Sequence, residues 1–130
     1  MASIFTKIIN NEIPSFKVAE NEDFIAILDA FPVAKGHVLV IPKIEIDKIF
    51  SMEKEHYNKL MAFSYDIAQA LEKSVPCLRI GMAVVGLEVP HVHVHLIPLN
   101  TMGDINFSKP KLQLDEAEMK AIAEKIKSYL

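Results

Sequence analysis

Three histidines occupy alternate positions in one short segment of the chain. His91, His93 and His95 lie in the stretch VPHVHVHLIP, residues 89–98, and the whole chain has five histidines. On a β-strand, side chains two residues apart point to the same side of the sheet. We therefore expect the three imidazoles to share one face, and the apolar residues between them to face the core.

A row of imidazoles on one face can be no more than the polar surface of a strand. If the row has a chemical role, that role is metal binding or nucleophilic catalysis. At about 3.3 Å per residue the Cα atoms of His91 and His95 lie ~13 Å apart, a poor geometry for one tetrahedral zinc bound by all three rings. Two histidines with a carboxylate, for which Glu88 is nearest, remain an alternative. A neutral imidazole is also a good nucleophile toward phosphorus when one ring nitrogen is held and the other is free. His93 is the natural attacking group, since a neighbouring imidazole on each side can bind a phosphate oxygen or protonate a leaving group.

The histidine strand needs a sheet and helices to position it. A run of strands, a helix, two more strands and a last helix predict an α+β fold with an antiparallel sheet of about five strands. Helical spacing predicts a short helix or turn at 3–12 capped by Ser3, a long helix from Ser51 to Lys73 with Ser51 as N-cap, and a C-terminal helix capped by Asp115. Alternating or continuous apolar runs predict strands near 15–21, 24–29, 37–41, 77–86 and 91–97.

Composition narrows the class of protein. The 130 residues, of which 51% are hydrophobic, are expected to form a single domain over residues 1–130. The net charge is −3 without a basic block, so nucleic acid is not an expected partner. The single cysteine, Cys77, allows neither an internal disulfide nor a Cys-x-x-Cys site. No apolar run approaches the ~20 residues of a membrane span, and charge comes too early for a signal peptide, so we expect a soluble cytoplasmic protein without membrane partners.

Two segments resemble a known family. HVHVHLI, residues 91–97, fits the signature His-φ-His-φ-His-φ-φ of the histidine triad (HIT) family at every position, where φ is apolar. The segment IFTKIINNEIPSFKVAENEDFIAILDAFPVAKGHVLVIPK, residues 4–43, resembles the N-terminal half of that family almost throughout. The resemblance covers roughly residues 3–100 and implies a HIT-like fold, with one long helix and a C-terminal helix.

The resemblance implies a role for each of four histidines. His93 matches the nucleophile that attacks the α-phosphate of a nucleotide and forms a covalent nucleotidyl-histidine, which water then hydrolyses. His95 matches the histidine that contacts the phosphate and assists the leaving group. His91 matches a more structural position, and His37, in the stretch PVAKGHVLVIP, matches a further histidine of the same network.

The resemblance also implies a nucleotide-binding surface. Asp29 matches the acid that accepts hydrogen bonds from the ribose hydroxyls, a role that suits a carboxylate at a strand end, although capping the turn before Pro32 is an alternative. Five apolar residues match positions that sandwich the base, where composition alone would place them in the core. They are Ile4, Phe5, Ile8, Ile27 and Leu39.

The loop before the triad departs from the family pattern. Many relatives have a longer glycine-rich loop ending in Gln-Ser or Gln-Thr, whereas here Leu87 and Glu88 occupy those positions. A carboxylate at position 88 repels a phosphate unless it is protonated, turned away or used as an acid. Gly86 keeps a flexible backbone whose amides can still contact the phosphate.

A second departure concerns zinc. Some relatives bind a structural zinc through an N-terminal Cys-x-x-Cys and a histidine that precedes the long helix. Here the matching residues are Ser3, Thr6 and Glu45, so we predict no zinc, and no cofactor is expected.

The resemblance thus implies a homodimeric hydrolase that binds a purine nucleotide or nucleotide conjugate. The expected substrate is a nucleoside phosphoramidate, a nucleotidyl adduct or a dinucleoside polyphosphate, and the product is a nucleoside monophosphate. Two alternatives remain: a non-catalytic nucleotide-binding or scaffold protein with a lapsed active site, and a metal-dependent hydrolase that uses the histidine row.

Overall fold

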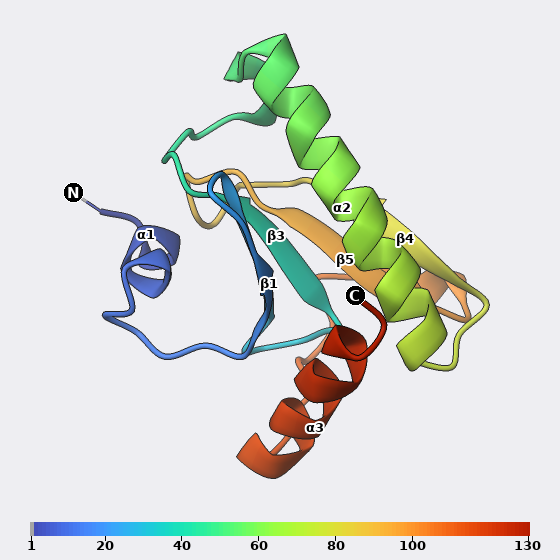
Figure 1. Ribbon diagram of the computed structural model, residues 1–130. Helices are drawn as coiled ribbons and strands as arrows, with labels where there is room; N and C mark the ends of the chain where they lie inside the picture. Colours follow the sequence, from blue (N-terminus) through green and yellow to red (C-terminus); the bar gives the residue numbers. More distant parts are fainter. Residues whose placement is uncertain (1) are drawn as a thin grey trace.

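The computed structural model describes residues 2–130 and contains one antiparallel sheet of five strands in the order β1-β2-β3-β5-β4. The long helix α2 runs across the strands, and α1 lies apart from it beside the sheet (Figure 1). The predicted α+β architecture is therefore confirmed. The elements are α1 (Ile4–Ile9), β1 (Lys17–Glu20), β2 (Phe24–Leu28), β3 (Val38–Pro42), η1 (Ile49–Ser51), α2 (Lys54–Ser74), β4 (Arg79–Ala83), β5 (Val94–Leu99), η2 (Met102–Ile105) and α3 (Glu116–Lys127).

The two faces of the sheet pack against different helices. In β2, Ala26 and Leu28 belong to the main core cluster, which includes apolar residues of α2 and α3. Ile25 and Ile27, on the opposite face, pack in a second cluster with Phe5 of α1. Because both faces are covered, every residue of β2 is buried, as its continuous apolar sequence predicts.

The long helix begins later than predicted. Ser51 is not its N-cap but the last residue of the 3-10 helix η1; α2 starts at Lys54 and Glu53 is the N-cap. Met52 explains the difference, because it is extended (φ −72°, ψ 148°) and 8% exposed within the main core cluster. The chain must insert this side chain before the helix can start. In residues 2–130 no helix combines the length and the apolar character that a membrane span requires.

Two smaller predictions about helix ends are confirmed. The Ser3 side chain caps α1 by accepting a hydrogen bond from the Thr6 N–H, and Asp115 caps α3 by accepting one from the Glu118 N–H. Each bond satisfies an amide that has no partner inside its helix. The cap of α1 also fixes the position of Ser3, which contacts the histidine segment.

The strand that carries the triad is shorter than predicted, since β5 starts at Val94 and not at His91. Its pairing with β3 ends at Val40↔Val94. Further along β3, Pro42 has no N–H to donate, and the Val92 N–H instead donates to the Ile46 carbonyl at 2.7 Å. The alternation of side chains nevertheless continues through this segment, because Val92 and Val94 both lie in the main core.

Candidate active site

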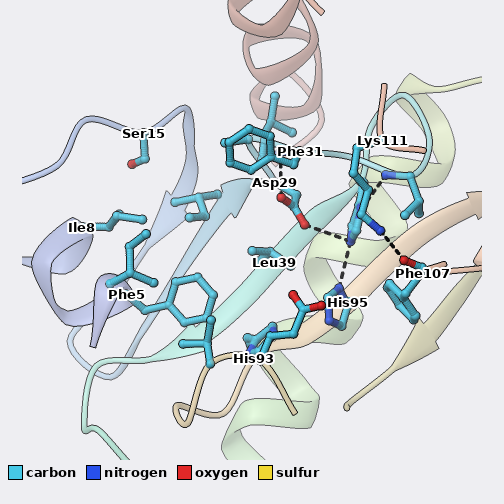
Figure 2. Close-up of a pocket in the computed structure, with 18 of the residues that line it drawn as sticks. Phe5, Ile8, Ser15, Asp29, Phe31, Leu39, His93, His95, Phe107 and Lys111 are labelled. Atoms are coloured by element: carbon cyan, nitrogen blue, oxygen red, sulfur yellow. Dashed lines mark hydrogen bonds and ion pairs between the residues drawn. The ribbon is translucent and has the colours of Figure 1, made fainter. Parts of the chain in front are cut away.

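A pocket of about 620 Å³ lies on the face of the sheet that carries α1 (Figure 2). Its walls come from α1, from β2 and β3, from the loop before the triad, and from the segment that precedes α3. The pocket brings together every site residue that the sequence predicts except His91. These are Ile4, Phe5, Ile8, Ile27, Leu39, Asp29, His37, Gly86, Glu88, His93 and His95.

The pocket has an apolar end and a polar end. Phe5 and Ile8 project from α1 at the apolar end, and Leu39 lies in the floor between them and the polar groups (Figure 2). Asp29 and His95 occupy the other end, from which hydrogen bonds can be made. A ligand with a flat apolar part and a charged part would match this division.

His93 has a fixed tautomer. Its Nδ1 lies 2.7 Å from the carbonyl oxygen of His91, which can only accept a hydrogen bond, so Nδ1 carries the proton of the neutral ring. The Nε2 atom therefore keeps its lone pair. The ring of Phe5 packs edge-on against the imidazole at 4.8 Å between centroids. Burial lowers the pKa of His93 below the usual histidine value, so the ring is neutral at pH 7.

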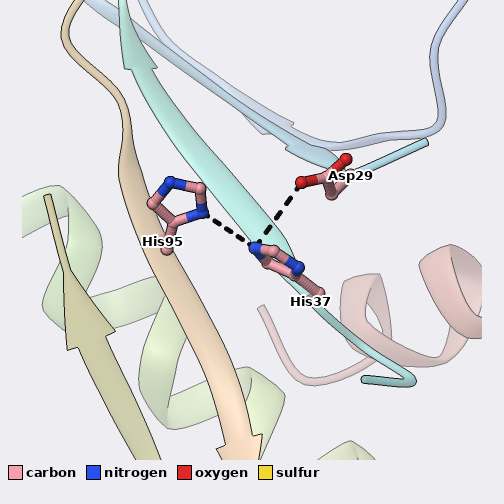
Figure 3. A group of neighbouring side chains, drawn as sticks. All are labelled: Asp29, His37 and His95. Atoms are coloured by element: carbon pink, nitrogen blue, oxygen red, sulfur yellow. Dashed lines mark hydrogen bonds and ion pairs between the residues drawn. The ribbon is translucent and has the colours of Figure 1, made fainter. Parts of the chain in front are cut away.

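His95 receives its tautomer through a relay (Figure 3). The Val33 N–H donates to His37 Nδ1 at 3.1 Å, so a neutral His37 carries its proton on Nε2. That nitrogen lies 2.9 Å from His95 Nδ1 and donates to it. His95 must then hold its own proton on Nε2, where it can be donated. The Val33 amide thus makes His95 a donor through two rings, whereas the His91 carbonyl leaves His93 with a free lone pair on Nε2.

The pKa values of the relay agree with neutral rings. Burial lowers the pKa of His37 to about 3 and that of His95 to about 4, and the neighbouring histidines and Lys111 act in the same direction. Burial raises the pKa of Asp29, whose carboxylate accepts a hydrogen bond from the Phe31 N–H at 2.9 Å. The other Asp29 oxygen lies 3.6 Å from His37 Nε2. At pH 7 the histidines therefore contribute hydrogen bonds and no positive charge.

This burial predicts a pH-dependent stability. Because His37 and His95 titrate near 3 and 4 when folded and near 6.5 when unfolded, the unfolded chain binds more protons between about pH 4 and 6.5. The free energy of unfolding should fall as the pH drops through this range, by about 2 kcal/mol per histidine at pH 5. Urea unfolding at pH 7.5 and pH 5 measures the loss. The double variant His37→Asn/His95→Asn should show a shallower dependence, and an equal slope in both proteins would contradict the assignment.

His91 lies behind the pocket and joins it to α1. The side chain is 0% exposed and its Nε2 donates to the Pro42 carbonyl at 2.8 Å. Its Nδ1 then accepts from Ser3 Oγ at 2.6 Å. Glu45 completes the cluster by accepting hydrogen bonds from the Ser3 N–H and the Thr6 hydroxyl, each at 2.7 Å. His91 is thus a structural link, because its carbonyl also orients His93.

The same cluster bears on the zinc prediction. Ser3 and Thr6 offer neutral hydroxyls, which do not belong to the thiolate, imidazole and carboxylate ligands that zinc uses in proteins. Both hydroxyls are also engaged in hydrogen bonds, that of Ser3 with His91 and that of Thr6 with Glu45. The residues therefore do not fit a structural zinc. Metal analysis of the purified protein should find less than one zinc per ten chains, and a stoichiometric amount would overturn the prediction.

Another set of residues has the composition of a metal site. Among the residues described, Asp29, His37 and His95 have ligand atoms within 4.8 Å of one another (Figure 3). Two imidazoles and one carboxylate form a familiar set for a divalent ion. An ion bound to His37 Nε2 and His95 Nδ1 would have to replace the proton that they share at 2.9 Å. The set differs from the histidine row, because it uses one triad member only.

Two further features of the site are an acid in the loop before the triad and a segment close to the C-terminus. Glu88 lines the pocket although its side chain is exposed, and its charge acts on His93 and Asp29, so it is not turned away. Phe107 and Lys111, in the segment before α3, also line the pocket, and neither is among the site residues predicted from the sequence. No periodic pattern marks them, since they lie in irregular structure.

The family assignment rests on comparisons with known proteins. The family model of the HIT domain matches residues 10–102. An adenosine 5'-monophosphoramidase from Schizosaccharomyces pombe is 32% identical over all of this chain and 99% of its own length. A second protein of that name, from Saccharomyces cerevisiae, is 40% identical over 75% of this chain and 62% of its own length.

Solved structures agree with this result. A HIT-like protein from Bartonella henselae superposes with a TM-score of 0.85 at 30% identity, over 98% of this chain and 96% of that one. The sequence match, the shared fold and the buried triad lead to one conclusion. The chain belongs to the HIT family.

Proposed function

We propose that the protein is a nucleotide hydrolase that releases a nucleoside monophosphate from a nucleoside phosphoramidate or a related nucleotide conjugate. The observation that carries the proposal is the tautomer of His93, because its Nδ1 is held by the His91 carbonyl and its Nε2 lone pair is free to attack. The two fungal relatives described as adenosine 5'-monophosphoramidases support the substrate class.

The reaction has two steps. In the first, His93 Nε2 forms a bond to the α-phosphorus, and the bond from phosphorus to the leaving nitrogen or oxygen breaks. The leaving atom takes the electron pair and accepts a hydrogen bond from His95 Nε2–H, and a proton from solvent completes the departing amine or hydroxyl. In the second step, water attacks the phosphorus, releases a proton to solvent and displaces His93, which returns to its starting tautomer while His95 keeps its proton throughout. His37 takes part only by holding the proton of His95 on the correct nitrogen.

The remaining pocket residues bind the nucleoside part of the substrate. Asp29 accepts hydrogen bonds from the two ribose hydroxyls through the edge of its carboxylate that is not committed to the Phe31 N–H. The apolar end of the pocket sandwiches a purine base between α1 and the sheet. This orientation brings the α-phosphate to the polar end, beside His93 and His95.

We further propose a homodimer. β4 is an edge strand of the sheet, so one row of its backbone groups has no partner strand in the described chain. Leu78 before this strand is 76% exposed, and Met82 within it is 49% exposed. Tyr65 of α2 is 63% exposed as well. Pairing of two β4 strands about a twofold axis would join two sheets and cover these side chains, and light scattering tests the expected mass of two chains.

A chemical quench tests the catalytic proposal directly. The protein is mixed with adenosine 5'-phosphoramidate, the release of AMP is followed, and the quenched protein is digested and analysed by mass spectrometry. An adenylyl group on the peptide that contains His93 is the expected result. AMP release without any protein-bound adenylyl group, even at the earliest times, would argue against a covalent intermediate.

Two rivals predict different outcomes of the same assay. A lapsed enzyme, in which Glu88 repels the substrate phosphate, should release no AMP until Glu88→Ser restores the hydroxyl. A metal-dependent hydrolase that uses Asp29, His37 and His95 should lose its activity to a chelator and regain it with a divalent ion. The proposed mechanism predicts activity in the unaltered protein that a chelator does not affect.

A further inference from the structure

The charges of the pocket are unevenly distributed. Asp29 and Glu88 both line it and both are acids, while its two histidines of lowest pKa, His37 and His95, are neutral at pH 7. Within residues 2–130, Lys111 is the one lysine or arginine among the lining residues. A nucleotide phosphate brings at least one negative charge into this pocket. Neutral donors alone leave that charge beside two carboxylates, which is unfavourable in a partly buried site.

Lys111 is held in place by its own segment. Its ammonium group donates a hydrogen bond to the Phe107 carbonyl at 2.6 Å and lies 5.8 Å from the centroid of the Phe107 ring. The ring of Phe107 in turn packs on the imidazole of His95, with 4.7 Å between centroids. Next to Lys111, the Leu112 N–H donates to the Pro32 carbonyl at 2.8 Å and ties the segment to the loop after β2. Figure 2 shows Lys111 and Phe107 on the His95 side of the pocket.

The ammonium group of Lys111 also has N–H donors that are available to a ligand. It has three N–H donors, of which the Phe107 carbonyl uses one. No carboxylate of the described chain lies within 4.0 Å of it, whereas Lys35 and Lys43 each form an ion pair with a glutamate. The charge of Lys111 is also felt at His95, which contacts the proposed phosphate site. The cation is therefore directed at the pocket and not neutralised by a protein anion.

We propose that Lys111 binds the phosphate of the nucleotide and makes the pocket selective for nucleotides over nucleosides. This inference rests on the proposed function for the identity of the ligand. Lys111 lies outside residues 10–102, which the HIT domain model matches, in the irregular segment between η2 and α3. The lysine compensates the acid at position 88, because one charge of each sign then faces the phosphate end.

Binding measurements separate the phosphate contact from the rest of the site. The dissociation constants of AMP and adenosine are measured by calorimetry for the unaltered protein, for Lys111→Gln and for Lys111→Arg. Loss of a charge-assisted hydrogen bond should raise the AMP dissociation constant about tenfold in Lys111→Gln and leave adenosine binding within about twofold. Lys111→Arg should retain most of the AMP affinity. Lys109→Gln is the matched control, because Lys109 belongs to the same exposed segment but does not line the pocket.

The inference and the proposed function can fail separately. An unchanged AMP affinity in Lys111→Gln, or an equal loss for AMP and adenosine, would overturn the role of Lys111 even if the protein hydrolyses a phosphoramidate. A selective loss of AMP affinity supports the role even if no hydrolysis is found. In an active protein, the KM of adenosine 5'-phosphoramidate should also rise in Lys111→Gln. A selective loss of AMP affinity in Lys109→Gln as well would show a general effect of surface charge and overturn the specific contact.

Discussion

Replacing His93 by alanine is expected to abolish the release of AMP from adenosine 5'-phosphoramidate. The substitution removes the Nε2 lone pair that the proposed mechanism uses as its nucleophile, and no other imidazole of the pocket can replace it. His95 holds a proton on its pocket-facing nitrogen, and both nitrogens of His37 are engaged. A drop in kcat on the order of 10⁴-fold to 10⁶-fold is the scale seen when a nucleophile is removed. Single-turnover kinetics and the quenched-protein mass spectrum measure the loss of turnover and of the adenylyl adduct together.

The fold should survive this substitution. His93 makes one hydrogen bond, to the His91 carbonyl, and it borders an open pocket, so alanine leaves no sealed cavity. We expect a loss of unfolding free energy of about 1–2 kcal/mol. AMP binding should persist, because the apolar wall and Asp29 are unchanged. His56→Asn is a useful control, since it removes a histidine outside the pocket and should leave turnover as it is. A His93→Ala protein with turnover comparable to the parent would falsify the nucleophile assignment.

The sequence pattern predicts the structure correctly where backbone geometry alone determines the direction in which a side chain points. Alternation alone separates the histidines from the core residues between them, and it remained valid although β5 begins only at Val94. The period-two pattern survives because Val92 and Val94 must both reach the core, whether or not the backbone is paired in a ladder. The resemblance, in turn, predicted residues that the structure gathers in one pocket. Ile4 and Leu39, for example, are 35 positions apart in the chain and both line the pocket.

Other features depend on tertiary contacts that leave no local signal. The start of α2 was predicted wrongly because Ser51 is a good capping residue, while the burial of Met52 is a long-range effect. The tautomers of the histidines follow from a carbonyl and an amide, which every residue has, so the sequence holds no trace of them. The same is true of Lys111, one of many lysines, whose role depends on where an irregular segment crosses the pocket.

Replacing His95 by alanine should have an effect that depends on the leaving group. In the proposed mechanism its Nε2–H donates a hydrogen bond to the departing atom, and the loss of one donor at a site of developing charge costs about 10²-fold to 10³-fold. A phosphoramidate with an alkylamine leaving group needs that hydrogen bond and should lose activity by this factor. An activated substrate, whose leaving group departs as a stable anion, should lose less than about tenfold. Both losses of activity, toward the alkylamine substrate and toward the activated one, are measured in the same variant. General damage to the site lowers both rates equally and therefore cancels in their ratio.

The relay makes a second variant informative in the same experiment. His37→Leu removes the donor to His95 Nδ1, so the His95 proton is free to occupy either nitrogen. The amine substrate should then lose about tenfold and the activated one almost nothing, because part of the His95 population lacks the proton where it is needed. A double variant that also carries His95→Ala should be no slower than His95→Ala alone, since His37 acts only through His95. If the two losses multiply instead, His37 touches the substrate itself, and the positioning role assigned to it here is wrong.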